Sequence, residues 1–206
     1  MKAIPREVRS DTNPVETTRR RRCWEKDSNI LKAYLWGAVH DGTYHYVHRT
    51  WRISQANDKW LQRIQDMLVQ MGYRSWIYRE GKSRSVSVIE TTADFLARPI
   101  SLLEMSVQEQ RAYIRGYFDA EGGIPRRADD WMYIQLCQKN RQELENISTV
   151  LERLGIHCGK IHNPSQRVDP NYWRLFIARK SHRDFIEIIG SWHPRKQLIL
   201  KHRLKI

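Results

Sequence analysis

Hydrophobic residues recur at helical spacing in two similar stretches of the chain, and each stretch stops at a glycine. Residues 57–71 predict an amphipathic helix that ends at Gly72, and residues 140–154 predict a second that ends at Gly155. The apolar side of the first holds Trp60, Leu61, Ile64, Met67, Leu68 and Met71, and that of the second holds Leu144, Ile147, Val150, Leu151 and Leu154. The similarity of the two stretches indicates a repeated unit.

The other predicted elements follow in the same order around these two helices. Each is preceded by a helix and a strand pair, predicted at 29–41, 43–48 and 49–54 in the first unit and at 107–121, 123–127 and 131–137 in the second. Each is followed by another strand pair and short helices, predicted at 74–80, 84–90 and 92–97, and at 156–162, 171–178, 181–190 and 194–204. Ile53-Ser-Gln-Ala-Asn57 corresponds to Leu136-Cys-Gln-Lys-Asn140, and the same offset of 83 residues relates Met71-Gly72 to Leu154-Gly155. The sequence thus predicts a duplicated α-β-β-α-β-β-α unit of the α+β class.

The predicted organisation has three parts. Residues 1–27 are polar and include the run Arg19–Arg22, so they are interpreted as a flexible basic arm that contacts phosphate, targets the protein or is simply solvated. Residues 28–104 form the first half and residues 105–206 the second.

The first helix of each unit combines small residues with a terminal acid. Ala112, Gly116 and Ala120 share one face, and because glycine costs about 1 kcal/mol in a helix interior, Gly116 indicates close contact with another backbone. Glu121 falls at the helix end, where the dipole disfavours a carboxylate and a cation would offset the repulsion. Ala33, Gly37 and Asp41 form a weaker copy. If the two helices pack along their small faces, Asp41 and Glu121 meet and require a proton or a metal ion between them.

Charge and composition narrow the choice of partner. The 206 residues carry a net charge of +13 with a pI near 9.9, which favours a polyanion, while eight Trp and nine Tyr argue against a disordered basic tail. The sequence has no apolar run long enough to cross a membrane and no signal-peptide core, so no membrane partner is expected. Cys23, Cys137 and Cys158 lack metal-site spacing and are expected to be three unpaired thiols in an intracellular, reducing setting, cytoplasmic or organellar.

The paired motifs resemble the LAGLIDADG homing endonuclease family, in its single-chain, two-motif form. Ile114-Arg-Gly-Tyr-Phe-Asp-Ala-Glu-Gly122 matches the nine-residue signature at every position, Leu35-Trp-Gly-Ala-Val-His-Asp-Gly42 is a shorter copy, and the resemblance covers about residues 29–204. It implies a monomer with an internal pseudo-twofold axis and two antiparallel sheets that form a saddle on double-stranded DNA. It also implies that the motif acids, Asp41 and Glu121, bind Mg²⁺ or another divalent cation such as Mn²⁺, with the carbonyl of Ala120 as a further ligand.

The first motif departs from the signature. Gly37 to Asp41 spans four positions, whereas Gly116 to Glu121 spans five. The first helix must therefore end one residue sooner or present Asp41 differently, and His40 is the alternative ligand nearby. Asp119 is expected to have a structural, hydrogen-bonding role. In the contrary interpretation both motifs are only packing helices, and the acids are capping residues.

The resemblance extends to further candidate catalytic residues. Gln55 and Gln138 match the polar residue after the second strand of each half and would orient water, although they are equally ordinary helix-entry residues. Lys196, with Arg195 beside it, matches a basic residue that would stabilise charge on the phosphate. The corresponding region of the first half, about 98–104, has no lysine, so the two cleavage centres are expected to be asymmetric.

Strand alternation predicts the DNA-facing side chains. In the first half Trp51 and Ile53 fit the core, which directs His48, Thr50 and Arg52 to DNA, and Arg74, Trp76 and Tyr78 are placed opposite Ile77 and Val88. In the second half Met132, Ile134 and Leu136 face the core, which directs Trp131, Tyr133 and Gln135 outward. Cations expected to meet phosphate, unless they are merely solvated, are Arg79, Lys82, Arg84, Arg126, Arg127, Arg167 and Arg174.

The resemblance implies a sequence-specific endonuclease that makes a double-strand break at a long asymmetric DNA target, with short 3′ overhangs, as in intron homing. The alternative is an RNA maturase, with intron RNA as partner, or a DNA-binding regulator with the same fold and no cleavage. A basic structural protein without activity is a third reading, which the paired motifs disfavour.

Overall fold

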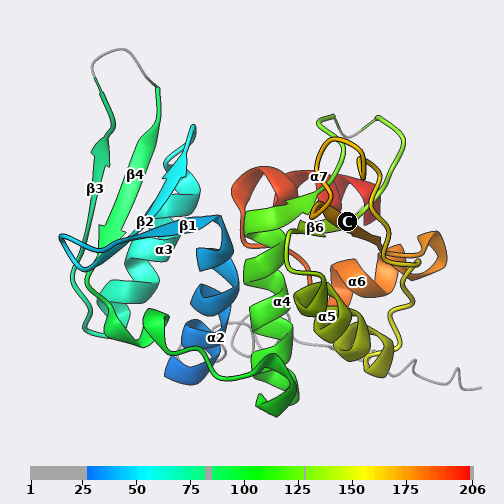
Figure 1. Cartoon of the computed structure of the whole chain (residues 1–206), viewed down its shortest axis with the longest axis horizontal. Helices are drawn as coiled ribbons and strands as arrows, with labels where there is room; N and C mark the ends of the chain where they lie inside the picture. Colours follow the sequence, from blue (N-terminus) through cyan, green and yellow to red (C-terminus); the bar gives the residue numbers. More distant parts are fainter. Residues whose placement is uncertain (1–26, 82–84, 128, 205–206) are drawn as a thin grey trace, which may run out of the picture.

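Two central helices form the seam of the molecule. The computed structural model describes residues 27–81, 85–127 and 129–204; within them, α2 (Ser28–Ala38) and α4 (Val107–Glu121) run side by side between two lobes (Figure 1). A Cβ added at Gly116 would lie 1.9 Å from the carbonyl oxygen of Tyr34, and one added at Gly37 would lie 2.1 Å from that of Tyr113. The predicted close contact of the motif helices through their glycines is confirmed.

Local signals fix the start of both seam helices. The side chain of Asp27 accepts a hydrogen bond from Asn29 N and caps α2. Ser106 and Glu109 form a reciprocal capping box, so α4 begins at Val107, and its observed bounds equal the predicted ones.

The first lobe is a four-stranded antiparallel sheet on the left of Figure 1. Its order is β1-β2-β4-β3, and the elements of this half are β1 (Gly42–His45), β2 (Thr50–Gln55), α3 (Lys59–Gln70), β3 (Ser75–Arg79), β4 (Ser87–Thr91) and the short 3-10 turns η2 (Asp94–Ala97) and η3 (Leu102–Glu104). Ile53 pairs with Ile89, and both side chains are buried in the core to which α3 contributes Trp60 and Leu61.

The turn between β1 and β2 corrects one prediction. Residues 46–49 form the turn, with Arg49 at φ 52°, so His48 lies outside the strands and not in the predicted alternation. Asn, Asp and Gly usually occupy this left-handed region, so the basic, aromatic sequence gave no turn signal. His48 is exposed and stacks on His45, with ring centroids 4.6 Å apart.

The second lobe holds a shorter sheet. Its order is β5-β6-β7, and its elements are β5 (Gly122–Gly123), β6 (Gln135–Gln138), α5 (Arg141–Arg153), β7 (Trp173–Phe176), η4 (Arg179–Ser181), α6 (His182–Ile188) and α7 (Pro194–Leu204). The strand predicted at 123–127 is reduced to two glycines, since Pro125 has no N–H for the ladder. Residues 156–162, predicted as a strand, contribute only two isolated bridges, Cys158 with Ile177 and His162 with Arg174.

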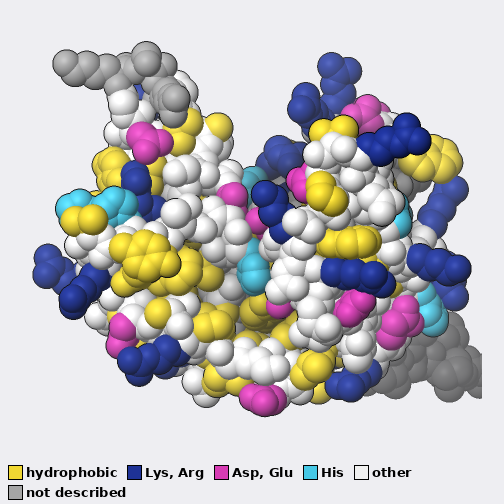
Figure 2. All heavy atoms as spheres, in the orientation of Figure 1, with side chains coloured by type: hydrophobic (Ala, Val, Ile, Leu, Met, Phe, Trp, Pro, Cys, Tyr) yellow, Lys and Arg dark blue, Asp and Glu magenta, His cyan; other side chains and the backbone are white. Residues whose placement is uncertain are grey.

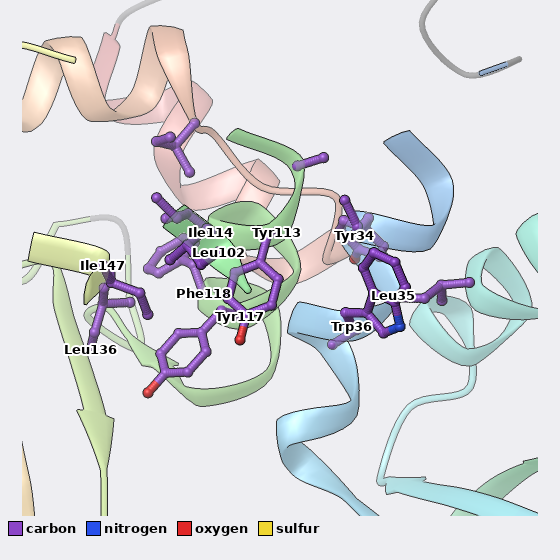
Figure 3. Close-up of a cluster of buried hydrophobic side chains, with 14 of the residues drawn as sticks. Tyr34, Leu35, Trp36, Leu102, Tyr113, Ile114, Tyr117, Phe118, Leu136 and Ile147 are labelled. Atoms are coloured by element: carbon purple, nitrogen blue, oxygen red, sulfur yellow. The ribbon is translucent and has the colours of Figure 1, made fainter. Parts of the chain in front are cut away.

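The hydrophobic core continues across both sides of the seam. Figure 3 shows Tyr113, Ile114, Tyr117 and Phe118 of α4 on the side of Leu136 and Ile147, with Leu35 and Trp36 of α2 on the opposite side. The buried residues of the two halves form one hydrophobic cluster. The two halves are therefore packed as a single body, which fixes the ends of α2 and α4 relative to each other.

Two further predictions concern the cysteines and the absence of a membrane-spanning segment. Cys137 and Cys158 are free thiols, whereas Cys23, like most of the proposed basic arm, lies outside the described residues. Among the helices that the structure describes, none has the length and apolar character needed to span a bilayer.

Candidate active site

The two motifs end in different kinds of helical turn. α4 continues as an α-helix through Glu121, whereas α2 stops at Ala38 and a 3-10 turn, η1 (Val39–Asp41), follows. The helix therefore ends sooner in the first motif, as one of the two predicted solutions required.

The 3-10 turn compensates for the missing residue. A 3-10 helix rises about 2.0 Å per residue and an α-helix about 1.5 Å. One α-helical and three 3-10 steps from Gly37 to Asp41 therefore advance about 7.5 Å, as do five α-helical steps from Gly116 to Glu121. Ideal geometry therefore gives Asp41 about the same advance from its motif glycine as Glu121, with a rotation about 40° smaller around the helix axis.

The two motif acids interact electrostatically. Gln55 Nε2 donates to Asp41 Oδ2 at 2.6 Å; burial raises the pKa of Asp41, while this bond and the charge of Lys196 oppose the rise. Burial, and then the charge of Asp41, raise the pKa of Glu121 to about 6. The two carboxylates therefore lie within electrostatic range of each other, and their repulsion favours a proton or a cation between them.

The donor chemistry of this pair suits a hard divalent cation. Both groups offer carboxylate oxygens, and nowhere in the described part of the chain do three or more His, Cys, Asp or Glu side chains gather as a metal cluster. A cation held by Asp41 and Glu121 would therefore take its remaining oxygens from phosphate and water, as Mg²⁺ commonly does. His40, the alternative ligand, has both ring nitrogens within hydrogen-bonding distance of other side chains, Tyr113 and Gln138.

Lys196 caps the C-terminal end of α4, where Glu121 is the last residue. Its side chain is buried, and Nζ donates to the carbonyl oxygens of Phe118 at 2.5 Å, Asp119 at 3.0 Å and Gly122 at 2.6 Å. Burial lowers the pKa of Lys196 to about 8. The carbonyl of Ala120, the predicted extra ligand, is not among the three. In the structure the three N–H donors of Lys196 point at backbone carbonyl oxygens. The contact of Lys196 with phosphate stays a prediction.

Asp119 is the structural acid of the second motif, as predicted. Its carboxylate is buried and accepts hydrogen bonds from Tyr34 Oη at 2.7 Å, Trp192 N at 2.8 Å, His193 N at 3.1 Å and Ser191 Oγ. These bonds tie α4 to α2 and to the segment before α7. The sequence offered no signal for Ser191 and Trp192, which lie more than 70 residues away.

The second glutamine does not copy the first. Gln138, at the end of β6, points Nε2 at His40 Nδ1 across 3.4 Å, and its Oε1 accepts from Lys139 N at 2.7 Å. Gln55 contacts its own motif acid, whereas Gln138 contacts the neighbour of the other motif acid. The two halves of the site are therefore unequal.

On the predicted DNA face of the first sheet, several side chains form hydrogen bonds with one another. Thr50 is 2 % exposed and donates to Glu90, which also accepts from Tyr78 Oη at 3.1 Å. Arg52 donates to Tyr78 Oη at 2.8 Å and pairs with Glu80 at 3.2 Å. Thr50 was expected to be exposed, and that prediction is wrong because Glu90, on the neighbouring strand, covers it.

The other predictions for the first half are confirmed for some residues and wrong for one. Trp76 is 40 % exposed, Arg74 is exposed just before β3, and Trp51 and Ile53 pack on the core as expected. Val88 pairs with Tyr78 and so shares its face, contrary to the prediction. Lys82 and Arg84 lie outside the described residues.

In the second lobe the residues predicted to face outward are exposed or half-buried, but β6 begins only at Gln135, so Trp131 and Tyr133 precede the strand and their exposure does not come from strand alternation. Trp131 is 75 % and Tyr133 36 % exposed, and Gln135 is half-buried, while Ile134 and Leu136 are fully buried. Arg174 pairs with Cys137 across the ladder and lies over the rings of Tyr172 and Phe176. The other described cations predicted to meet phosphate, Arg79, Arg126, Arg127 and Arg167, are exposed. Figure 2 shows a hollow between the two lobes, with Lys and Arg side chains on the rim of the right-hand lobe.

Comparison with known proteins assigns the fold. Residues 108–190 match the family model of the LAGLIDADG-like domain, and no curated protein matches. The structure of I-DmoI in complex with DNA and Mn superposes with a TM-score of 0.60 at 21 % identity, covering 81 % of this chain and 99 % of that one. The complex with DNA and Ca gives 0.59 at 21 % identity, covering 85 % and 98 %.

A second group of structures shares the same fold. Full-length DUF199/WhiA from Thermatoga maritima superposes with a TM-score of 0.64 at 15 % identity, covering 88 % of this chain and 65 % of that one. The chain therefore has the LAGLIDADG fold, with two sheets consistent with a two-half saddle, and its second half contains a LAGLIDADG-like domain. It is similar in structure both to the homing endonuclease I-DmoI and to DUF199/WhiA.

Proposed function

We propose that this protein is a metal-dependent endodeoxyribonuclease that binds a long asymmetric DNA duplex as a monomer and cuts both strands. The observation that carries the proposal is the placement of Asp41 and Glu121 at the end of the α2–α4 seam, where partial desolvation raises the pKa of both carboxyl groups and the charge of Asp41 adds to the rise for Glu121. The hollow between the lobes and the net charge of +13 support a duplex as the ligand.

Each residue has a stated task in this proposal. Asp41 and Glu121 hold Mg²⁺ or Mn²⁺, which supplies Lewis-acid stabilisation of the phosphate and of the leaving oxygen. Gln55 holds the Asp41 carboxylate in one orientation through its 2.6 Å bond. Lys196 fixes the last turn of α4 and places a positive charge below Glu121. Trp131, Tyr133, Gln135 and Trp76 face the duplex and read or contact bases.

Nucleic-acid binding without cleavage is the second candidate function, as in a maturase or a regulator. One observation favours it: Gln138 is turned to His40, so Glu121 lacks the amide contact that Asp41 receives from Gln55. In this case the same saddle binds DNA or intron RNA, and the paired acids have no catalytic task.

Charge-neutral substitutions of the motif acids test the proposal. Duplexes cleaved in Mg²⁺ are first selected from a randomised library, and single-turnover cleavage is then measured. We expect Asp41→Asn and Glu121→Gln each to slow cleavage by more than about a hundredfold, since each removes a metal ligand. Asp66→Asn and Glu104→Gln, which neutralise exposed acids elsewhere, serve as matched controls and should cleave normally. Binding without cleavage by the unsubstituted protein would support the second function, and undiminished cleavage by both variants would exclude the site.

The raised pKa of Glu121 predicts the pH dependence of metal binding. Because Glu121 protonates with a pKa of about 6, calcium or manganese affinity should fall as pH is lowered through 6. In the metal-free protein, the raised pKa of Glu121 makes the folded state more stable at low pH than at high pH. A carboxyl whose folded pKa lies above the ordinary value of 4.5 makes unfolding easier as pH rises from about 4.5 to 6.

Two titrations check this prediction. Calorimetry between pH 5 and 8, values chosen to bracket the pKa by about one unit or more, should show the loss of metal affinity. Denaturant unfolding in EDTA should show a drop in stability between pH 4.5 and 6 that is smaller in Glu121→Gln than in the unsubstituted protein. Identical pH profiles for the two proteins would show that Glu121 is not perturbed.

A further inference from the structure

A chain of four hydrogen bonds crosses from the second half to the turn that carries Asp41. Lys139 N donates to Gln138 Oε1 at 2.7 Å, and Gln138 Nε2 lies 3.4 Å from His40 Nδ1. His40 Nε2 lies 2.8 Å from Tyr113 Oη, which donates to Glu143 Oε1 at 2.7 Å. The chain thus joins β6, η1, α4 and α5. Tyr113 and Glu143 lie 30 residues apart, and the sequence alone gave no reason to connect them.

The carboxylate end of the chain fixes the direction of two bonds. An ionised carboxylate has no hydrogen, so the single hydroxyl hydrogen of Tyr113 must point at Glu143. Tyr113 Oη can then only accept from His40, which requires a proton on His40 Nε2.

The amide end of the chain constrains the other ring nitrogen. A backbone N–H can only donate, so the Gln138 atom facing Lys139 N must be oxygen, and the atom facing His40 must be the NH₂ group. That group donates, so His40 Nδ1 must carry a lone pair. The tyrosine end thus requires a proton on Nε2 and the amide end requires an unprotonated Nδ1, and together they define the neutral His40 ring with its proton on Nε2.

The ring itself is held between two tyrosines of α4. Its centroid lies 4.8 Å from that of Tyr117 and 6.0 Å from that of Tyr113, both in edge-on geometry. His40 immediately precedes Asp41 in the 3-10 turn, whose hydrogen bonds are weaker than those of an α-helix. The contacts of the His40 side chain with α4 compensate for these weaker hydrogen bonds.

From this geometry we infer that Glu143, acting through Tyr113, is a positioning residue for the shortened motif. It sets the tautomer of His40, and His40 in turn holds Gln138 and seats the turn that presents Asp41. The device exists in one half only, because no histidine precedes Glu121. The consequence for catalysis rests on the proposed function: the two strands should be cut at unequal rates, and loss of the relay should change their ratio.

Nitrogen-15 NMR of the full chain tests the relay without DNA. In protein labelled at histidine, long-range ¹H–¹⁵N correlations identify the tautomer of each ring, and His40→Asn assigns the signal. We expect the Nε2–H form in the unsubstituted protein. Glu143→Gln keeps an acceptor oxygen and should preserve that form. Glu143→Leu frees the Tyr113 hydroxyl to donate to Nε2, in competition with the 3.4 Å contact of the Gln138 amide with Nδ1. The Nε2–H population should therefore fall, while the control Glu145→Leu on the same helix should leave the spectrum unchanged.

The possible results distinguish the relay, the positioning role and the proposed function from one another. An Nδ1–H ring in the unsubstituted protein, or no response to Glu143→Leu, would overturn the relay. On a cleaved duplex, strand-specific nicking should show Glu143→Leu slowing one strand by about tenfold more than the other, with Glu143→Gln close to normal. Equal slowing of both strands would overturn the positioning role. If the unsubstituted protein cuts no DNA, the proposed function fails, while the NMR result still decides the relay.

Discussion

Replacing Gly116 with alanine is expected to cost about 3 kcal/mol or more of the free energy of unfolding. The new Cβ would lie 1.9 Å from the carbonyl oxygen of Tyr34 and 3.0 Å from the amide nitrogen of Ala38, so α2 and α4 must separate. Overpacking a rigid contact commonly costs 1–3 kcal/mol, and here backbone rather than a flexible side chain must yield. The gain of about 1 kcal/mol from removing a helix-interior glycine is smaller. Denaturant unfolding measures the net effect, which corresponds to a fall of about 10 °C in Tm.

The chain supplies a reciprocal variant and a control for this result. Gly37→Ala meets Tyr113 O at 2.1 Å and Tyr117 N at 2.6 Å, so it should destabilise the protein to a similar extent. Gly159→Ala places its Cβ 3.5 Å from the nearest atom, Phe176 O, and should be close to neutral. If all three variants unfolded alike, the seam would not be the close contact described. Because Asp41 and Glu121 are held by these helices, metal affinity should fall together with stability in the two seam variants only.

Lys196→Met is expected to destabilise the protein by about 3–5 kcal/mol, the cost of breaking a buried charge arrangement on one side. Three carbonyl oxygens, the buried ones of Phe118 and Asp119 and the partly buried one of Gly122, would lose their donor. The buried carboxylate of Asp119 would also lose the positive charge that opposes its raised pKa. Methionine fills a similar volume, so the loss reports charge and hydrogen bonding more than packing.

A second consequence of this substitution concerns the acids. The charge of Lys196 lowers the pKa of both Asp41 and Glu121, so its removal should move the pH dependence of metal binding to higher pH. Lys201→Met, an exposed lysine on the same helix, is the matched control and should change neither stability nor the pH profile. Normal stability of Lys196→Met would contradict the role of Lys196 as the cap of α4.

Both predictions concern the support of the site rather than its ligands. The glycines set the distance between the helices, and Lys196 with Asp119 sets the direction of the last turn of α4. A carboxylate pair with raised pKa values is costly to assemble, so a rigid frame around it is physically required. The frame is built from backbone contacts and buried hydrogen bonds, which relax little when a metal or phosphate arrives.

Helix positions and the motif acids were within reach of the sequence because their signals are local. The bounds of α4 follow from Ser106, Glu109 and the glycines after Glu121, and α3 and α5 follow from apolar spacing and a terminal glycine. Strand lengths were less accessible. A ladder needs donors on both strands, and Pro125 removes one where alternation still continues.

Side-chain partnerships across long sequence separations were out of reach. Thr50 alternates as a DNA-facing residue, yet Glu90, 40 residues away, covers it. Lys196 fits the position of a phosphate-binding lysine, yet its donors point at carbonyls 74 to 78 residues earlier. In each case the sequence pattern predicts which face of its element the residue occupies. The neighbouring element in the folded protein determines its hydrogen-bond partners.

By itself the sequence determined the duplication, the two glycine-bearing helices and the acid at the end of each. These features depend on glycine spacing and helix termination, which are signals between residues close together in the sequence. Only the tertiary structure decided how the shortened motif works: η1 recovers the lost height, and a relay from Glu143 through Tyr113 to His40 secures it. The physical reason is that a hydrogen bond depends on distance and direction between atoms, and those are fixed only when the two halves pack.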